Sequence, residues 1–417
     1  MKKALCLLMS MLLVFSVFSF CVSAADKTYG DYQYSIRDDG TVKIVKYTGD
    51  DKKVTIPEKI KGKTVAVLGN ESFWYLKTLE EVVIPETIET IGKHAFKECN
   101  NLKKVTIENG VETIKGGAFS CCRKLESIVI PDSVTEMGDM VFYNCKALKE
   151  IKLSKNLTKI GSGILASSAY FKDKSNWDGN LLYVDKYLVD SHAECLSGTV
   201  TVKKGAVLIA DRAFSFVVGN NLEKVVLPKS LKYIGNYAFL NNYYLEEVEF
   251  NEGLEAIGKQ AFRQCTSLKN VELPASVKKI GEKALGYASD TAKDADLKII
   301  EGFTITGYAN TEAEKYAEKN EITFNCKKPK TPKVKISAKN RKIKVKYTKT
   351  TGADGFQVRY TRNGKTTTKT YNTLKSVTKS TAKLSKGTYK VKVRAFAKTE
   401  GKKLYSKWTL AKTVKIA

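Results

Sequence analysis

A pattern of hydrophobic and polar positions repeats every 23 residues through most of this chain. Each copy begins with an aliphatic residue, has a large apolar residue five positions later, and closes on a short alternating segment such as Ile128-Val129-Ile130. Alternation of this kind predicts a half-buried strand. A unit this short cannot bury its own apolar side, so neighbouring copies must stack into a β-rich solenoid. Nine aliphatic positions predict nine turns: Leu68, Ile91, Ile114, Met137, Ile160, Ile209, Ile234, Ile257 and Ile280.

The ends of a solenoid need caps, because the last turns would otherwise expose core side chains. A hairpin signal at Asp38-Asp39-Gly40 predicts an N-terminal cap, which with the first repeat strand covers residues 26–66. The solenoid is expected over residues 67–326, with an insert at 166–208 where the spacing is broken. Near its end, Thr311 followed by Glu314 predicts a capping-box start for a short closing helix.

The pattern changes after a proline-containing linker at residues 327–333. Residues 334–417 contain seven short strand-like segments, in which Phe356, Val358 and Tyr360 alternate with polar residues. The Asn363-Gly364 pair is typical of a tight hairpin. The length and spacing of these segments predict an all-β sandwich.

The charge of the chain is concentrated in this second region. The formal net charge is +27, and residues 327–417 hold 28 lysines and arginines against only Asp354 and Glu400. The first 326 residues are balanced, with 43 basic and 42 acidic side chains. Ordinary solubility needs a net charge of about 2 to 8 on a small domain. The excess indicates attraction to an anionic polymer, with teichoic acid, extracellular nucleic acid and host glycan all left open. The candidate binding residues alternate with core positions and so should line outer faces: Lys342, Lys344, Lys346, Arg359, Lys390, Lys392 and Arg394.

Residues 1–25 have the features of a signal peptide. Lys2 and Lys3 precede an apolar run, and Val22-Ser23-Ala24-Ala25 is a small-residue cleavage site. No second apolar stretch reaches the roughly 20 residues that span a bilayer, so no transmembrane segment is expected. We therefore expect a secreted, extracellular protein.

Two resemblances follow from these motifs. The repeated phrase, clearest at IGKHAFKECNNLKKVTI in residues 91–107, resembles the BspA-like family of bacterial leucine-rich repeat surface proteins over residues 34–326. Residues 331–417 resemble a fibronectin type III domain through GADGFQVRY, GTYKVKVRAF and Trp408. The first resemblance implies extracellular protein binding or adhesion at the bacterial cell surface.

The chain offers few residues for catalysis or metal binding. Its only histidines are His94 and His192, so a histidine-rich metal site cannot form. Cys195 beside His192 is a weak candidate nucleophile pair, because it lies in the insert without a local signature. Cysteines three positions after the repeat phenylalanine are expected to be small buried hydrophobic side chains: Cys99, Cys122, Cys145 and Cys265. We expect no enzyme, cofactor or metal.

The candidate ligand-binding residues of the solenoid occupy variable repeat positions. They are aromatic residues, which serve as binding anchors or else fill edges between turns, and middle residues of the repeat strands: Trp74, Tyr75, Tyr143, Lys152, Tyr237, Tyr243, Tyr244, Glu249 and Glu272. The sequence favours a secreted or cell-surface adhesion protein, in which the solenoid binds an extracellular protein or glycan and the basic domain adheres to an anionic cell-wall polymer. The alternatives are an extracellular nucleic-acid or glycan binder acting through the basic domain and, less favoured, an enzyme using Cys195 and His192.

Overall fold

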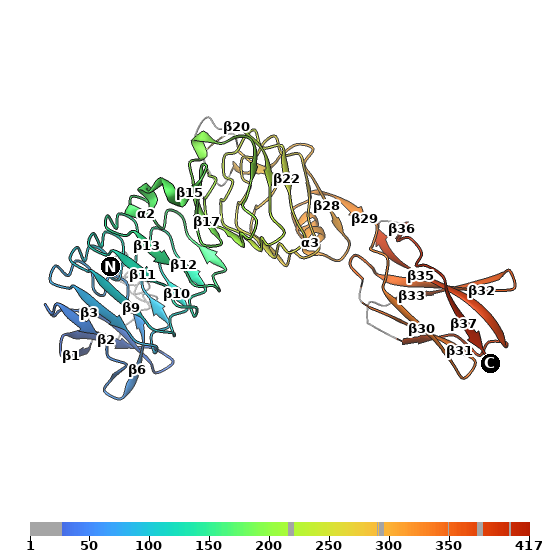
Figure 1. The fold of residues 1–417 in the computed structure, drawn as a ribbon, viewed down its shortest axis with the longest axis horizontal. Coiled ribbons are helices and arrows are strands. Elements are labelled where there is room, and N and C mark those ends of the chain that lie inside the picture. Colours follow the sequence, from blue (N-terminus) through green and yellow to red (C-terminus); the bar gives the residue numbers. More distant parts are fainter. Residues whose placement is uncertain are drawn as a thin grey trace, which may run out of the picture.

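The computed structural model describes residues 27–215, 221–289, 291, 296–348, 350–372, 378–399 and 402–417. It shows an arched β-solenoid followed by a separate β-sandwich (Figure 1). The predicted fold class is therefore confirmed. The predicted signal peptide lies outside the described residues.

Each regular solenoid turn contributes two strands, and these form two parallel ladders. One ladder consists mainly of two-residue strands that contain the repeat aliphatic residue, so that Ile91 lies beside Ile114. Its first part contains β6 (Lys63–Leu68), β8 (Thr90–Ile91), β10 (Thr113–Ile114), β12 (Glu136–Met137) and β14 (Lys159–Ile160). Its second part contains β17 (Tyr187–Ser191), β19 (Leu208–Ile209), β21 (Tyr233–Ile234), β23 (Ala256–Ile257) and β25 (Lys279–Ile280).

The second ladder contains the closing strands of the repeats. They are β4 (Lys53–Thr55), β7 (Glu81–Ile84), β9 (Lys104–Ile107), β11 (Ser127–Val129), β13 (Glu150–Lys152), β18 (Ser197–Thr201), β20 (Asn221–Val226), β22 (Glu247–Glu249), β24 (Asn270–Glu272), β28 (Thr304–Tyr308) and β29 (Thr323–Lys327). The solenoid has about 12 turns rather than nine. The additional turns come from the insert and the two ends, where strands such as β18 and β29 continue the ladder without the repeated phrase.

Stacked phenylalanine rings form the centre of the solenoid core. Successive rings of Phe73, Phe96, Phe119 and Phe142 lie 4.9, 5.2 and 5.7 Å apart between centroids. A second column joins Phe214, Phe239 and Phe262 at 4.7 and 4.8 Å. All seven are fully buried. Burying one such side chain contributes about 1.5–3 kcal/mol, so each turn is stabilised mainly by the turns beside it.

The front of the solenoid is closed by β1 (Lys27–Tyr29), β2 (Tyr32–Ile36) and β3 (Val42–Tyr47), which pair in antiparallel order. Strand β3 then pairs in parallel with β6 and joins this hairpin to the first ladder. Strand β5 (Lys59–Ile60) pairs with β6 in antiparallel order. The Tyr47 ring stacks on Phe73 at 5.2 Å and covers the end of the phenylalanine column.

The back of the solenoid is closed by α3 (Glu312–Lys319), which packs against β25, β28 and β29. Strands β26 (Tyr287–Ala288) and β27 (Lys298–Ile299) form an antiparallel pair, and the Tyr287 hydroxyl donates to Asn320 at the end of the helix. The helix buries Ala313, Tyr316 and Ala317. The capping box predicted at its start is wrong in its details. The Thr311 hydroxyl donates to the Tyr308 carbonyl at 2.6 Å and caps no helix amide, while Glu314 accepts from the backbone N–H of Asn310 at 2.6 Å.

The insert becomes part of the solenoid. It comprises α2 (Ala169–Lys172), two 3-10 turns (Lys174–Asn176 and Ala193–Cys195), β15 (Trp177–Asp178) and β16 (Leu181–Val184), which forms a hairpin with β17. Strand β17 pairs in parallel with β19, whereas β14 belongs to a different sheet. The first ladder is thus divided in two, and the solenoid bends at this point (Figure 1).

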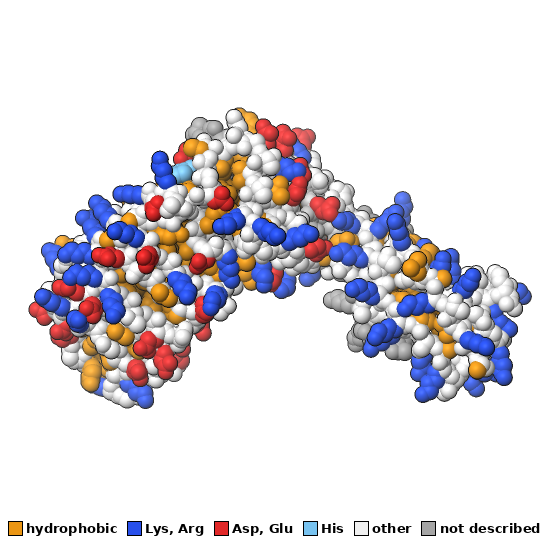
Figure 2. Space-filling view, viewed as in Figure 1, with side chains coloured by type: hydrophobic (Ala, Val, Ile, Leu, Met, Phe, Trp, Pro, Cys, Tyr) orange, Lys and Arg blue, Asp and Glu red, His pale blue; other side chains and the backbone are white. Residues whose placement is uncertain are grey.

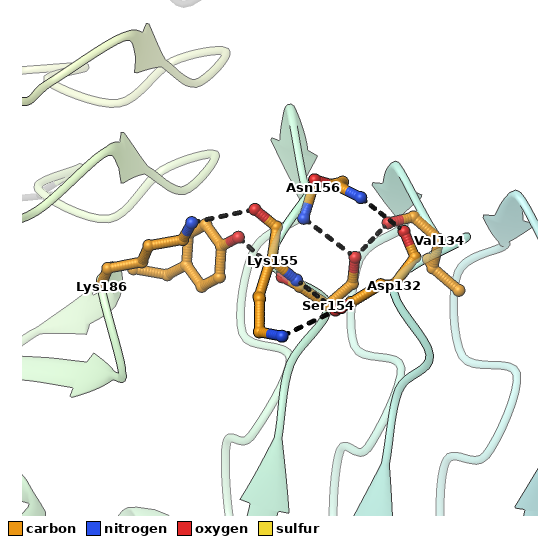
Figure 3. Close-up of polar contacts among 7 residues, drawn as sticks. Asp132, Val134, Ser154, Lys155, Asn156 and Lys186 are labelled. Atoms are coloured by element: carbon orange, nitrogen blue, oxygen red, sulfur yellow. Dashed lines mark hydrogen bonds and ion pairs between the residues drawn. The ribbon is translucent and has the colours of Figure 1, made fainter.

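Side chains connect the two halves across the bend. Figure 3 shows Lys186 reaching from the insert hairpin to the loop that follows β13. The Lys186 Nζ donates to the Lys155 carbonyl at 2.9 Å, and the Tyr187 hydroxyl donates to the Ser154 carbonyl at 2.6 Å. The Ser154 hydroxyl in turn donates to the Val134 carbonyl at 2.6 Å. They add to a backbone bond between the halves, in which the Asp211 N–H donates to the Ile160 carbonyl at 2.9 Å.

The C-terminal region is a sandwich of two antiparallel sheets around its own core. One sheet contains β30 (Val334–Lys339), β31 (Lys342–Tyr347) and β34 (Thr378–Ser380). The other contains β32 (Gly355–Arg362), β33 (Lys365–Tyr371), β35 (Gly387–Thr399), β36 (Lys402–Tyr405) and β37 (Lys412–Ile416). Tyr347 and Phe356 join the sheets, with ring centroids 3.9 Å apart. Asn363 and Gly364 both have positive φ angles and form the predicted hairpin turn between β32 and β33.

Candidate binding surfaces

The exposed aromatic residues of the solenoid lie in separate places. Trp74 and Tyr75 form a pair in the first phenylalanine turn, with centroids 5.8 Å apart and about half of each side chain exposed. Tyr143 lies three turns further along, whereas Tyr243 and Tyr244 belong to the second half of the solenoid. The structure therefore does not gather these predicted residues into one patch.

Two of the candidate tyrosines occupy backbone positions with left-handed geometry. Tyr75 has φ 62°, at the position two residues after the repeat phenylalanine where other turns place Asn144 and Gln264 with similar angles. Tyr237 has φ 55°, at the position two residues before it, where other turns place Met140 and Gln260. The Tyr237 ring is only half-buried but is covered by the Arg212 guanidinium at 4.5 Å. The Tyr75 ring is more exposed, although Lys77 Nζ lies over it at 4.8 Å.

The middle residues of the closing strands form the expected outer row. Register pairs place Val83 beside Thr106, Val129 beside Lys152, and Val226 beside Glu249. Val129 is 59% exposed, which is high for a valine and marks an apolar point on this face. The acidic members already have partners. Glu249 pairs with Lys224 at 2.6 Å, and Glu272 pairs with Lys327. Lys152 is exposed.

The predicted basic residues of the sandwich divide between two outer faces. On the five-stranded sheet, Arg359 lies beside Lys392, and Lys390 and Arg394 follow the same side of β35. Lys342, Lys344 and Lys346 alternate with core residues on β31, in the other sheet. The two outer faces of a sandwich point in opposite directions, so the seven residues make two surfaces. In Figure 2 the visible side of the sandwich carries blue lysine and arginine side chains, while red carboxylates gather on the solenoid.

A stack of rings and guanidinium groups on the five-stranded sheet was missed by sequence reasoning. The guanidinium groups of Arg359 and Arg394 lie 4.3 and 4.5 Å from the centroid of the Trp408 ring. Arg394 also lies 3.7 Å from the Tyr405 ring, and its Nε donates to Gln357 Oε1 at 2.9 Å. The sequence marks Trp408 only as a late tryptophan among basic residues. Its partners come from two other strands, which the pattern along the chain does not connect.

The repeat cysteines are free, buried thiols with one shared contact. Each Sγ donates to the carbonyl of the phenylalanine in the preceding turn. The distances are 3.1 Å for Cys99, 3.2 Å for Cys122, 3.1 Å for Cys145 and 3.2 Å for Cys265. Asn242 occupies the same repeat position, and its Nδ2 donates to the Phe214 carbonyl at 2.9 Å. Burial raises the pKa of Cys99 to about 12, so this thiol stays protonated and keeps its donor.

The Cys195 and His192 pair lacks the geometry of a nucleophile and its base. Cys195 is exposed, and no hydrogen bond joins its Sγ to the His192 ring within the described part of the insert. The imidazole instead stacks on Trp177 with centroids 4.0 Å apart, and its Nδ1 lies 3.4 Å from a carboxylate oxygen of Glu194. Across the described residues, no group of three or more His, Cys, Asp or Glu side chains is placed to hold a metal ion. The described helices also include none that is both long and apolar enough to cross a membrane.

Comparison with known proteins identifies the repeats. Among solved structures, the chain is similar to a leucine rich cell surface protein from Faecalibacterium prausnitzii A2-165, with 23% identity, 73% of this chain and 95% of that chain covered, and a TM-score of 0.31. It is also similar to a leucine-rich repeat protein from Bacteroides capillosus, with 27% identity, 31% and 97% coverage, and a TM-score of 0.29. A third is the pneumococcal vaccine antigen PcpA, with 18% identity, 73% and 99% coverage, and a TM-score of 0.31.

The search of curated proteins gave no match. A family model described as BspA type leucine rich repeat region matches residues 66–188 and 190–298, in six copies. These segments make up more than half of the chain, and they coincide with the stacked turns described above. The protein therefore belongs to the BspA-type leucine-rich repeat family.

Proposed function

We propose that this protein is a secreted or cell-surface adhesion protein, in which the solenoid binds an extracellular protein or glycan and the sandwich adheres to an anionic surface polymer. Proteins of the BspA-type family are typically bacterial surface proteins, and leucine-rich repeats typically bind proteins and carry no enzymatic activity. The proposal adds the division of labour between the two regions and the nature of the surface polymer.

The observation that carries the proposal is that the net charge and the long exposed surface lie on different parts of the chain. The solenoid is nearly neutral and offers a long outer row with exposed points such as Val129, and exposed aromatic side chains such as Trp74 and Tyr244. Exposed aromatic side chains are common anchors at protein interfaces. The sandwich carries almost the whole net charge of the chain.

We propose the corresponding division of the chain into a signal peptide (1–25), an N-terminal cap with the first repeat strand (26–66), a solenoid with its insert and C-terminal cap (67–326), a linker (327–333) and a fibronectin type III-like domain (334–417). The two-sheet arrangement, with the three-stranded sheet β30-β31-β34 opposite a larger one, supports the last assignment. The separate hydrophobic core of this region supports its treatment as a domain.

The solenoid's part in this function is tested by a double variant, Tyr243→Ala with Tyr244→Ala, in the full chain. If these tyrosines are anchors, affinity for a partner captured from extracellular host material falls by more than about 1 kcal/mol, or roughly fivefold. Leu410→Ala is the matched control, because Leu410 is 91% exposed but lies in the sandwich. Unchanged capture by the double variant, with its circular dichroism intact, would place the site elsewhere on the solenoid.

A further inference from the structure

We propose that one face of the sandwich is a binding site for a polyol phosphate chain, a linear phosphodiester polymer that carries no bases. This face, here called the arginine face, is formed by Arg359, Lys390, Lys392, Arg394 and Trp408 on the outer side of the five-stranded sheet. The inference rests on the proposed adhesion to anionic polymers. It assigns that adhesion to one of the two basic faces and to one class of polymer.

The guanidinium groups of the arginine face are held in place before any ligand binds. Arg359 and Arg394 both stack on Trp408, and Arg394 is held further by Tyr405 and by the hydrogen bond to Gln357. An arginine normally loses about 2 kcal/mol of side-chain entropy when a ligand fixes it. Here most of that freedom is already lost in the free protein, so a phosphate meets donors that are preorganised.

The positive charges of the arginine face are not neutralised by carboxylates. In the described part of the domain the sole acidic side chain is Asp354, which lies at the junction with the solenoid and accepts from Asn310 and from the Lys398 backbone N–H. Burial is the main cause that lowers the pKa of the Arg394 guanidinium; Tyr405 opposes this shift, and the neighbouring Arg359 adds to it. An anion bound between the two arginines would relieve this repulsion.

The spacing of the face suits a repeating anion. Lys390, Lys392 and Arg394 are alternate residues of one strand, so their Cα atoms are about 6.8 Å apart. A poly(glycerol phosphate) chain, with six backbone bonds between successive phosphorus atoms, has a repeat of similar extended length. A second row, of hydroxyl groups, lies on the neighbouring strand β33. Thr368 lies beside Arg359 and Thr370 beside Gln357, and each hydroxyl accepts a hydrogen bond from its neighbour's side chain. Hydroxyl groups and guanidinium groups are both effective donors to phosphate oxygens.

The aromatic rings of this face argue against a nucleic acid. Proteins that bind single-stranded nucleic acids offer ring faces on which bases stack. Here the Trp408 ring is shared by two guanidinium groups and the Tyr405 ring is covered by Arg394. The rings therefore serve to position the arginines, and the face recognises the phosphodiester backbone.

The opposite face of the sandwich provides a matched control. On β30 and β31, Lys335 pairs with Lys346 and Lys339 pairs with Lys342, with Ser337 beside Lys344. This lysine face has a similar charge, and among the described residues Lys342, Lys344 and Lys346 make none of the ring contacts found for Arg359 and Arg394. A site defined by charge alone would use both faces equally, whereas a site defined by preorganised guanidinium groups would use only the arginine face.

The test uses the full chain and purified poly(glycerol phosphate) of defined length, with binding measured by interferometry at fixed salt. Three variants are compared: Arg359→Gln, Lys392→Gln and Arg394→Gln together; Lys342→Gln, Lys344→Gln and Lys346→Gln together; and Arg359→Lys with Arg394→Lys. The first and second lose the same charge, and the third loses none. We expect a loss of at least tenfold for the first, less than threefold for the second, and about fivefold for the third.

Each other outcome has a definite meaning. Equal losses for the two glutamine variants would overturn the inference but leave adhesion to anionic polymers standing. If the variant with Arg359→Lys and Arg394→Lys binds with wild-type affinity, the role of the stacked arginines is refuted. Tighter binding to an oligothymidine of equal charge than to poly(glycerol phosphate) would overturn the choice of polymer. Failure of the wild-type chain to bind any of these polyanions would contradict both the inference and the proposed function of the sandwich.

Discussion

At the scale of single residues, the cysteine column is explained by hydrogen bonding as well as by packing. Each thiol meets a phenylalanine carbonyl of the preceding turn, and Asn242 does the same with its amide. A buried carbonyl without a donor costs about 1–3 kcal/mol, so a residue at this position must be small and must donate. Hydrophobicity alone would not account for asparagine at a fully buried position.

Substitutions at Cys122 distinguish these two explanations. Cys122→Ala leaves the Phe96 carbonyl without its donor and leaves a small cavity, so we expect a loss of about 1–3 kcal/mol in the free energy of unfolding. Cys122→Ser keeps a donor and should be less destabilising than the alanine variant. Urea unfolding followed by fluorescence gives both values. If alanine is tolerated better than serine, the position selects only for apolar character.

The sequence predicts the phenylalanine column and fails at features made by residues far apart in the chain. Period and spacing place Phe96 above Phe73 because stacked turns repeat the same backbone path. The stack of Arg394 and Trp408 has no such period, since it depends on how a loop after β36 folds over the sheet. The candidate tyrosines show the same limit. Position in the repeat predicted that Tyr237 and Tyr244 lie outside the fixed core positions, but not that Tyr244 is exposed while Arg212 covers Tyr237.

At the scale of elements, the insert hairpin carries a carboxyl group whose ionisation opposes folding. Burial raises the pKa of Asp190 to about 6, although its side chain accepts from the Ser191 backbone N–H and lies near His192. The folded protein therefore holds this proton more tightly than the unfolded chain, where the pKa is about 3.9. The loss of folding stability caused by ionised Asp190 is absent below about pH 4, where the carboxyl is protonated in both states, and is fully present above about pH 6.

The corresponding variant is Asp190→Asn. It should raise the free energy of unfolding at pH 7.5 by about 1–2 kcal/mol and leave it unchanged near pH 4. Thermal unfolding at the two pH values measures the difference. Asp185→Asn is the control, because Asp185 is exposed at the turn of the same hairpin and should have little effect at either pH. An equal gain at both pH values would show that ionisation of Asp190 is not the cause.

The bend of the solenoid depends on a few side-chain bonds at the same hairpin. The Tyr187 hydroxyl and Lys186 both donate to carbonyls of the loop after β13 (Figure 3). Strands β14 and β17 lie in separate sheets, and between the two halves these bonds act together with the backbone bond from the Asp211 N–H to the Ile160 carbonyl. The insert is therefore a structural element of the arch. A ligand that contacted both halves would have to fit the angle between them.

The bend is tested by Tyr187→Phe. Loss of the bond to the buried Ser154 carbonyl should lower the free energy of unfolding by about 1 kcal/mol and broaden the distance distribution from small-angle X-ray scattering. Tyr244→Phe removes a hydroxyl from an exposed ring and should change neither measurement. If Tyr187→Phe has the scattering profile of the native chain, the bend is fixed by backbone packing alone.

At the scale of the whole molecule, the two regions meet through a small and mainly polar junction. Lys330 of the linker pairs with Glu252 of the solenoid at 2.8 Å, and Asn310 donates to Asp354 at 3.0 Å. Gly352 packs against the Tyr308 ring, where a Cβ would come within 2.7 Å of a ring carbon. The arrangement joins an almost neutral solenoid to a strongly basic domain, and each has its own hydrophobic core. Adhesion to the surface and binding of a partner can therefore act on different parts of one molecule.

The measurement that tests this account most directly is the salt dependence of adsorption of the full chain to purified anionic wall polymer. If four basic side chains engage phosphates, the logarithm of the affinity should fall linearly with the logarithm of salt concentration, with a slope of about −3. Adsorption should then persist at physiological ionic strength, where charges are screened over about 8 Å, and be lost near molar salt. A slope near zero, or adsorption that survives molar salt unchanged, would contradict the assignment of surface adhesion to the basic sandwich.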